Sequence, residues 1–577
     1  MSEVQTPSEE FQRTVIRAIQ LERSVTPNTL SLRILECSDT NFGCKVRVST
    51  LEFEQEGEES DLVIDEKFRG AQVSWAGKES NRALLAQLSA DIDDVLILRG
   101  VYAFELASVT TLELESLDFL SPIVAAWRSR EWGAKSLLQY TSMGSAVAVD
   151  QVSLAQHSIA ARLSPSQQGA LDLVNHRVGF LWGPPGTGKT ECCAVMLGAY
   201  LMAKADCKIL VVGVANDPLD QVIHRTDDLL KLYGRNDLRA DITRYGVGAL
   251  RGFYEHLLPG TSDELAPARP KESVASNLVL KDPELPGFKS DQKVTRLFAL
   301  SVASAIARIE QLRAMAPFDL LLIEEASQAN WAQVLPLMSL AKSTVVAGDP
   351  AQLSPVAKSE HADVRQWMGR SAFSAMPMLD SDCVHMLMEQ RRMAEPICKL
   401  VSKVGYGEKL VTAPDRLING MWQSERKITF AGFTANQHVI VPKFQVPLGS
   451  LGAKYRLNSA ARILEMLIEQ RATVTGLNAE HVLILSPFRR QVRLIRSLLD
   501  KNGFREVLVK TVHKTQGKEA KIVIFDPVDG NCEFLKSEEA KHLLTVAFSR
   551  AKAKLLVLAS DVDCANPILQ MVKDFSH

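Results

Sequence analysis

A glycine-rich segment followed by lysine and threonine is the clearest chemical signal in the sequence. Residues 183–190 read Gly-Pro-Pro-Gly-Thr-Gly-Lys-Thr and match G-x-x-x-x-G-K-[ST], between a predicted strand and a predicted helix. Such glycines let backbone N–H groups surround a phosphate, and the helix N-terminus adds partial positive charge. Lys189 would reach the β and γ phosphates, and Thr190 would hold Mg²⁺. We therefore expect a nucleotide site formed by Gly183, Pro184, Pro185, Gly186, Thr187, Gly188, Lys189 and Thr190.

Two adjacent glutamates are the second chemical signal. Residues 319–326 read Asp-Leu-Leu-Leu-Ile-Glu-Glu-Ala, so Glu324 and Glu325 stand at the carboxyl end of an apolar strand. Ligands bind at that edge of open α/β sheets. Glu324 would position Mg²⁺ and Glu325 would orient an attacking water. Alone, the pair could be an exposed acidic turn, but after a phosphate loop it indicates nucleotide hydrolysis.

Composition limits the class of protein. The chain has 577 residues with 46% hydrophobic and 23% charged residues, and its formal net charge is −2. These values exclude a mainly disordered chain and a uniformly basic coat for nucleic acid, while a local basic groove stays open. No apolar run reaches the ~20 residues of a membrane span, and the acidic N-terminus is unlike a signal peptide. Nine cysteines without a CxxC pair favour reduced thiols over zinc sites. We expect a cytoplasmic protein, with a nuclear location also open, that needs no membrane.

The N-terminal region is predicted to be a small β-barrel flanked by two helices. Thr6 and Glu9 match a capping box that begins a helix reaching Ser24. From about residue 30 to 120, apolar and polar residues alternate with the period of half-buried strands. Ser121 begins a second predicted helix, which continues through Trp132.

From about residue 150, short apolar runs alternate with helical patterns, as is typical of parallel strands covered on both faces. A segment rich in Pro, Ser and Glu near residues 259–286 is predicted to be an exposed insertion. We therefore expect three domains. They are residues 1–145 with helices and barrel, residues 146–380 with an insertion at about 225–295, and residues 381–577.

Further motifs follow in a fixed order. They are Leu163–Ala170, Asn216 with Asp220 and Gln221, Gly348–Pro355, Gln390–Met393, Pro487–Gln491, Thr515–Glu519 and Val546–Lys552. With the phosphate loop and acidic pair, this series resembles the superfamily 1 helicases of the 5′-to-3′ branch, specifically the group of the up-frameshift helicase of nonsense-mediated decay and senataxin. The resemblance covers about residues 160–560. It implies an α/β fold with two RecA-like P-loop domains, an N-terminal β-barrel on a helical stalk, and ATP with Mg²⁺ as cofactors.

The resemblance also implies how single residues meet the nucleotide. Gln167 would hydrogen-bond the adenine edge, and Gln352 would sense the γ-phosphate. Gly517 and Glu519 would line the nucleotide, with Glu519 at the ribose. Arg392 and Arg550 would be arginine fingers from the second α/β domain, a device that accelerates phosphoryl transfer by ~10³–10⁵. The expected catalytic set is Lys189, Glu325, Gln352, Arg392 and Arg550.

Three positions depart from the family pattern. Glu324 stands where the family has aspartate, so the longer side chain changes how Mg²⁺ is reached, unless the contact runs through water. Arg391 stands where a tyrosine often stacks on adenine, and a planar guanidinium can also stack. Thr545 replaces a common asparagine.

The partner implied by the resemblance is single-stranded nucleic acid, DNA or RNA, running across both α/β domains. The residues expected to face it are Asn216, Ser304, Pro487, His513 and Thr515. Such contacts would reach sugar and phosphate, which do not carry sequence. The basic stretch from Arg489 to Arg496 is either a solvated helix face or part of this path. In the family that the sequence resembles, a small barrel in the corresponding position lies over the nucleic-acid exit.

These observations favour an ATP hydrolase that is a helicase or translocase, moving 5′ to 3′ on single strands as a monomeric motor. The alternatives are a remodeller that displaces proteins and unwinds little, and an ATP-gated nucleic-acid clamp with little turnover. Nothing in the sequence separates DNA from RNA, because no residue above distinguishes the 2′-hydroxyl.

Overall fold

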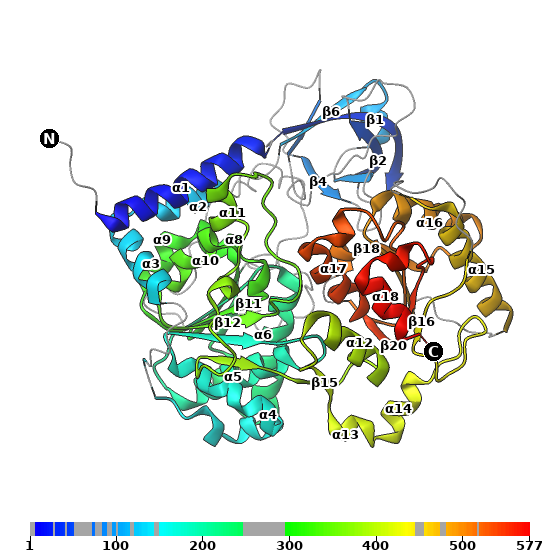
Figure 1. The fold of residues 1–577 in the computed structure, drawn as a ribbon. Helices are drawn as coiled ribbons and strands as arrows, with labels where there is room; N and C mark the ends of the chain where they lie inside the picture. Colours follow the sequence, from blue (N-terminus) through cyan, green and yellow to red (C-terminus); the bar gives the residue numbers. More distant parts are fainter. Residues whose placement is uncertain are drawn as a thin grey trace.

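The computed structural model describes most of the chain, and the described residues form a closed barrel, two larger parallel sheets and one two-stranded pair (Figure 1). The described residues are 6–26, 29–40, 43–50, 72–75, 84–88, 95–99, 102–115, 120–142, 149, 151–245, 295–444, 455–473, 481–515 and 518–576. Within these ranges, no helix combines the length and apolar character needed to cross a membrane.

The N-terminal strands form a closed barrel in the order β1-β2-β5-β4-β3-β6. They are β1 (Thr29–Thr40), β2 (Gly43–Thr50), β3 (Gln72–Ser74), β4 (Leu84–Leu88), β5 (Val95–Arg99) and β6 (Thr111–Glu115). All pairs are antiparallel, and alternate residues such as Val46 and Val48 fill the interior. In Figure 1 these strands lie at the top of the view, beyond the end of the first helix.

Three helices flank the barrel in sequence: α1 (Pro7–Val25), α2 (Leu120–Trp127) and α3 (Arg130–Ser142). The predicted capping box of Thr6 and Glu9 is present at the start of α1. The second helix predicted through Trp132 is in fact two helices, because the chain leaves helical geometry at Arg128 and Ser129. Apolar side chains of α1 and α2 share one core with the first α/β sheet, and Trp127 Nε1 donates to the carbonyl of Ala332 at 2.8 Å. These helices therefore belong structurally to the first α/β sheet.

The first lobe is a seven-stranded parallel sheet with helices on both faces, in the order β13-β7-β12-β11-β8-β10-β9. Its strands are β7 (Val178–Trp182), β8 (Ile209–Gly213), β9 (Ile242–Arg244), β10 (Leu297–Ser301), β11 (Phe318–Glu324), β12 (Ala341–Gly348) and β13 (Val384–Met386). Its helices are α4 (Pro165–Gln168), α5 (Lys189–Ala203), α6 (Asn216–Leu232), α7 (Asn236–Arg239), α8 (Val302–Ala307), α9 (Ile309–Met315), α10 (Trp331–Met338) and α11 (Ala362–Trp367). Successive residues of one strand, Phe180 and Leu181, enter two different cores, which explains the continuous apolar runs.

The predicted insertion is shorter than expected within the described chain. Residues 225–245 continue α6 and form α7 and β9, and β9 pairs with β10 as the last strand of the sheet. Residues 246–294 of the expected insertion lie outside the described residues.

The second lobe is a five-stranded parallel sheet in the order β16-β20-β19-β17-β18. Its strands are β16 (Val439–Ile440), β17 (Val482–Ser486), β18 (Leu508–Thr511), β19 (Ala520–Phe525) and β20 (Ala551–Val557). Its helices are α12 (Glu395–Gly405), α13 (Pro414–Leu417), α14 (Gly420–Arg426), α15 (Leu457–Thr473), α16 (Arg489–Lys501), α17 (Glu538–Phe548) and α18 (Pro567–Asp574). A short parallel pair, β14 (Glu389–Gln390) with β15 (Val411–Thr412), lies at the junction of the lobes. Two parallel α/β sheets are thus present, as the sequence predicted, and their lobes lie side by side (Figure 1).

Candidate nucleotide site between the two lobes

The phosphate loop connects β7 to α5, as predicted. Gly188 adopts φ +85°, a left-handed conformation that glycine accepts without strain, and α5 begins at the next residue. A Cβ on Gly186 would lie 2.6 Å from Arg392 Cβ, so the second lobe rests directly on this loop. The backbone N–H of Arg391 donates to the Gly186 carbonyl at 2.9 Å. The loop is therefore contacted by the segment that carries Arg391 and Arg392, two of the three arginines expected at the nucleotide.

Lys189 lies between the two glutamates. Its Nζ is 2.7 Å from Glu325 Oε1 and 3.3 Å from Glu324 Oε1. Burial would lower the pKa of Lys189, but the two carboxylates outweigh it and raise that pKa above its usual value. Burial raises the pKa of Glu324 to about 7, with Lys189 opposing and Glu325 reinforcing the rise. Two carboxylates thus hold one ammonium at the carboxyl edge of β11.

Glu325 has an unusual backbone for its residue type. Its φ of +53° is left-handed, a conformation that costs a non-glycine residue ~1–3 kcal/mol. Such strain is common where a side chain must be aimed at a reacting group. It turns the Glu325 carboxylate toward Lys189 at the point where β11 ends.

The two expected arginine fingers come from the second lobe and reach this region. Arg392 Nε is 2.5 Å from Glu519 Oε2, and Arg550 Nη2 donates to Gln352 Oε1 of the first lobe at 3.3 Å. Burial and the neighbouring Arg392 lower the pKa of Arg550 to about 10, whereas Glu325 raises it. Arg550 is therefore close enough to both Arg392 and Glu325 for their charges to shift its pKa.

Arg550 also keeps an unused donor. It is only 4% exposed, and its Nε–H has no hydrogen-bond partner within the part of the chain that the structure describes. The guanidinium of Arg391 is held by Glu389 and Asp415 through Nη2, and its Nη1 has no hydrogen-bond partner among the described residues. Arginines elsewhere in the described chain, such as Arg296, Arg313 and Arg456, also have an unpartnered Nε–H, and what distinguishes Arg550 and Arg391 is their place at the expected nucleotide site.

Glu519 and Gln167 are held by contacts within the chain. Burial would raise the pKa of Glu519, but Arg392 and Lys552 outweigh it and lower the pKa, so the carboxylate holds the guanidinium of Arg392. Gln167 Oε1 accepts from the Ser164 N–H at 2.9 Å, and its Nε2 donates to the Thr187 carbonyl at 2.8 Å. Its amide therefore braces the phosphate loop and keeps only one N–H for a base. Gly517 lies outside the described residues.

The residues expected to face nucleic acid lie in two groups. Asn216 begins α6 after β8, and Ser304 lies in the first turn of α8 after β10; β8 and β10 are neighbouring strands in register. Pro487 and His513 follow β17 and β18, which are also paired neighbours. Thr515 is the exception.

Thr515 cannot contact a strand directly in this structure. Its side chain is 0% exposed, and its hydroxyl donates to the Val512 carbonyl at 2.6 Å. The prediction of a contact residue is therefore wrong for Thr515, which instead shapes the turn that presents His513.

Two groups of supporting residues were not expected from the sequence. Arg244 Nη2 donates to Asn216 Oδ1 at 2.8 Å, and its Nε donates to Asp220 at 2.9 Å, so a buried ion pair fixes Asn216. Asp349 is 1% exposed and accepts four hydrogen bonds, one of them from Tyr406 in the second lobe. Asp349 belongs to a recognised motif, but Tyr406 carries no signal in the sequence.

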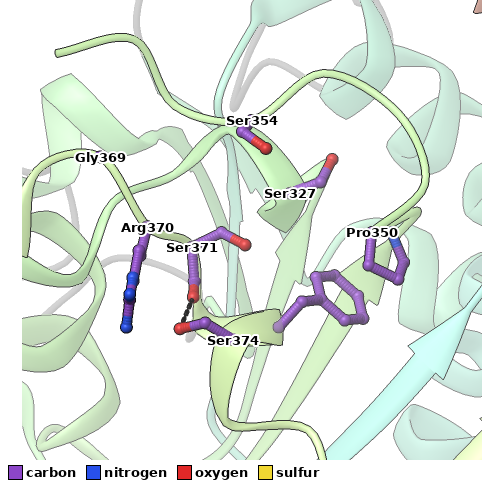
Figure 2. A pocket seen from close by; sticks show the side chains of 8 residues that line it. Ser327, Pro350, Ser354, Gly369, Arg370, Ser371 and Ser374 are labelled. Carbon is purple, nitrogen blue, oxygen red and sulfur yellow. Dashed lines mark hydrogen bonds between the residues drawn. The ribbon is translucent and has the colours of Figure 1, made fainter. Parts of the chain in front are cut away.

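A polar pocket of about 220 Å³ lies beside the acidic pair. Figure 2 shows the side chains of Ser327, Ser354 and Ser371 around it. Ser327 is 2% exposed, and its Oγ has no hydrogen-bond partner among the described residues. The pocket is bordered by the loops that follow β11 and β12, which also carry Glu325 and Gln352.

Comparisons with known proteins agree with this arrangement. Residues 302–360 and 368–562 each match a domain family described as AAA domain. The chain is 26% identical over 409 residues to the DNA replication ATP-dependent helicase/nuclease dna2 of Schizosaccharomyces pombe, covering 66% of this chain and 26% of that protein. It is 26% identical over 435 residues to the DNA polymerase alpha-associated DNA helicase A of the same yeast, covering 69% and 63%. It is 24% identical over 434 residues to the DNA-binding protein SMUBP-2 of Rattus norvegicus, covering 69% and 42%.

The chain therefore spans less than two thirds of the length of these relatives. Among solved structures, the arterivirus nonstructural protein 10 helicase matches 94% of this chain and 79% of its own, at 11% identity and a TM-score of 0.39. That similarity is too low to inform the function.

A phosphate loop in the first of two parallel α/β lobes, contacted by arginines of the second lobe, is the arrangement of a two-lobed P-loop fold. The domain matches and the relatives make the chain similar to the superfamily 1 helicases of the up-frameshift-like group.

Proposed function

We propose that the protein is an ATP-hydrolysing motor that moves 5′ to 3′ along single-stranded nucleic acid. The observation that carries this proposal is the convergence of Arg550 and Arg392 from the second lobe on the phosphate loop and acidic pair of the first. A site divided between two lobes links nucleotide state to lobe closure, because ATP binds both halves and product release separates them.

ATP would replace the internal partners that now hold the charged groups. Its phosphates would enter the phosphate loop and take Lys189 from Glu325, which would free that carboxylate to accept a proton from an attacking water. Arg550 would direct its unpartnered Nε–H to the γ-phosphate, and Arg392 would leave Glu519 to reach the same oxygens. Gln352, already beside Arg550, would contact the γ-phosphate from the first lobe.

Thr190 and Glu324 would hold Mg²⁺. Both offer hard oxygen donors, and Mg²⁺ in P-loop proteins takes few protein ligands because phosphates and water complete its shell. Glu324 is 1% exposed, with Lys189 and Cys193 as neighbours, so its carboxylate faces a protected space at the strand end. When bound, the ion would neutralise charge on the β and γ phosphates.

The second partner would be a single strand of DNA or RNA along the edge formed by Asn216, Ser304, Pro487 and His513. All four follow the carboxyl ends of parallel strands, two in each lobe, so relative motion of the lobes would change the spacing of the two contact groups. The names of the relatives dna2, DNA helicase A and SMUBP-2 refer to DNA, which supports a nucleic-acid partner.

The test is ATP turnover measured with single-stranded DNA, with single-stranded RNA and with neither. We expect single strands to stimulate turnover, and Lys189→Ala and Glu325→Gln to abolish it. Duplexes with a 5′ overhang should open faster than those with a 3′ overhang. Unstimulated turnover with no opening of either duplex would overturn the motor, and tight ATP-dependent strand binding with negligible turnover would instead support a clamp.

A further inference from the structure

Asp349 is the point where the two lobes share a buried carboxylate. It follows β12, and its Oδ1 accepts from Trp182 Nε1 at 2.9 Å and from the Ala351 N–H at 3.1 Å. Its Oδ2 accepts from Gln352 Nε2 and from the Tyr406 hydroxyl, both at 2.6 Å. Three of these donors belong to the first lobe. Tyr406 alone comes from the second lobe, at the end of α12.

Gln352 is held from both sides by these contacts. Its Nε2 donates to Asp349, and its Oε1 accepts from Arg550 of the second lobe. A glutamine amide can be rotated by half a turn, which exchanges its donor and its acceptor. A carboxylate on one side and a guanidinium on the other permit only one of the two orientations. Asp349 therefore sets which end of the Gln352 amide faces the arginine finger.

Tyr406 and Arg550 are carried by the same structural unit. Tyr406 packs in the second-lobe core with residues of α17 and β20, the elements on either side of Arg550. Tyr406 is 3% exposed, and its ring lies 6.2 Å from that of Trp182. When the second lobe moves, the hydroxyl of Tyr406 and the guanidinium of Arg550 must move together relative to Asp349 and Gln352.

We propose that Tyr406 is a positioning residue that couples lobe closure to the orientation of Gln352 through its hydrogen bond to Asp349. Closure brings the hydroxyl onto the carboxylate, which fixes the carboxylate and with it the glutamine amide. Opening removes this donor and leaves Asp349 with its own-lobe partners. The inference rests on the proposed function, because it names a further residue that controls the same site.

The first measurement is ATP turnover of Tyr406→Phe with saturating single strand. We expect kcat to fall ~10-fold or more, because the variant loses one hydrogen bond to a charged group that acts on the barrier of the reaction. KM should change by less than ~3-fold, because this bond does not act on ATP binding. The matched control is Tyr140→Phe in α3, whose hydroxyl accepts from Gln366 at 3.2 Å, and its turnover should be unchanged. Equal effects in the two variants would overturn the proposal.

The second measurement separates positioning from a structural role. In a Gln352→Ala background, Tyr406→Phe should reduce kcat by less than ~2-fold, because the residue through which it acts is gone. The full loss persisting in that background would show that Tyr406 acts only through stability and would overturn the proposal.

The third measurement does not depend on turnover. Dyes attached through unnatural amino acids at Leu232 and Ile418, exposed positions in the two lobes, report the lobe separation by energy transfer without nucleotide. Tyr406→Phe should lower the transfer efficiency relative to the parent chain and to Tyr140→Phe. A parent chain without any ATP turnover would overturn the proposed function. The lower transfer efficiency of Tyr406→Phe would still support the coupling in that case, and an unchanged transfer efficiency would overturn the coupling.

Discussion

Replacing Lys189 with methionine should make the stability of the nucleotide-free protein strongly dependent on pH. The ammonium of Lys189 lies 3.3 Å from Glu324 and 2.7 Å from Glu325, and Glu324 is 1% exposed. Removing one partner of a buried ion pair costs about 3–5 kcal/mol when the other charge stays ionised. Glu324 can reduce that cost by keeping a proton, so the cost depends on pH.

The sign follows from the pKa of Glu324 in the two states. Burial, the largest cause, raises its folded pKa to about 7 from the usual 4.5, so its contribution to stability is fully present below about 4.5 and is lost as pH rises through 7. Without Lys189, which lowers this pKa, the folded value rises further. From pH 7 to 8.5 the variant then loses up to about 2 kcal/mol, which is about 1.6 kcal/mol more than the parent chain, at about 1.4 kcal/mol per pH unit.

The assay is urea unfolding at pH 6, 7, 8 and 8.5 without nucleotide, read from the first transition because a chain with several lobes does not unfold in one step. The double variant Lys189→Met with Glu324→Gln is the control, and it should lose the extra pH dependence. Parallel stability curves for the parent chain and Lys189→Met across this range would refute the reasoning, since the ammonium would then not be compensating a buried carboxylate.

Three further outcomes are expected. Glu325→Gln should lower ATP turnover by ~10²-fold or more while a fluorescent ATP analogue still binds within about 3-fold of the parent affinity, because the change removes a proton acceptor and keeps the size of the side chain; a parent-like turnover would contradict the assigned role. Arg244→Met should destabilise the protein by about 3–5 kcal/mol, since Asp220 is 0% exposed and loses its guanidinium partner, whereas Arg235→Met, at a more exposed pair, should cost about 1 kcal/mol or less in the same unfolding assay. The affinity for single strands should fall linearly on a log–log plot against salt concentration, because the contacts are to phosphate, and a salt-independent affinity measured by fluorescence anisotropy would argue against this binding edge.

The sequence predicted those features that depend on neighbouring residues. Buried strands such as β7 and β17 are continuous apolar runs because both faces of each sheet are covered. The capping box joins two residues three positions apart, Thr6 and Glu9, and the phosphate loop is a motif of eight consecutive residues. In each case the physical cause lies within a few residues, so the pattern contains it.

The features that escaped prediction are contacts between distant segments. Tyr406 meets Asp349 across 57 residues, and Trp127 meets Ala332 across 205, so neither hydrogen bond leaves a local pattern. Thr515 lies in a motif expected at the nucleic-acid surface, yet the turn that it forms buries its own side chain. Motif position gives the neighbourhood of a residue, while burial depends on packing that only the fold supplies.

The most direct test of the divided site is the single-turnover rate of γ-phosphate cleavage in the parent chain and in Arg550→Ala, each loaded with ATP and single strand. The proposed site predicts that ATP stays bound with similar affinity while cleavage slows by ~10³-fold or more, because the guanidinium from the second lobe acts on the transition state. Cleavage at the parental rate in Arg550→Ala would contradict hydrolysis between the two lobes.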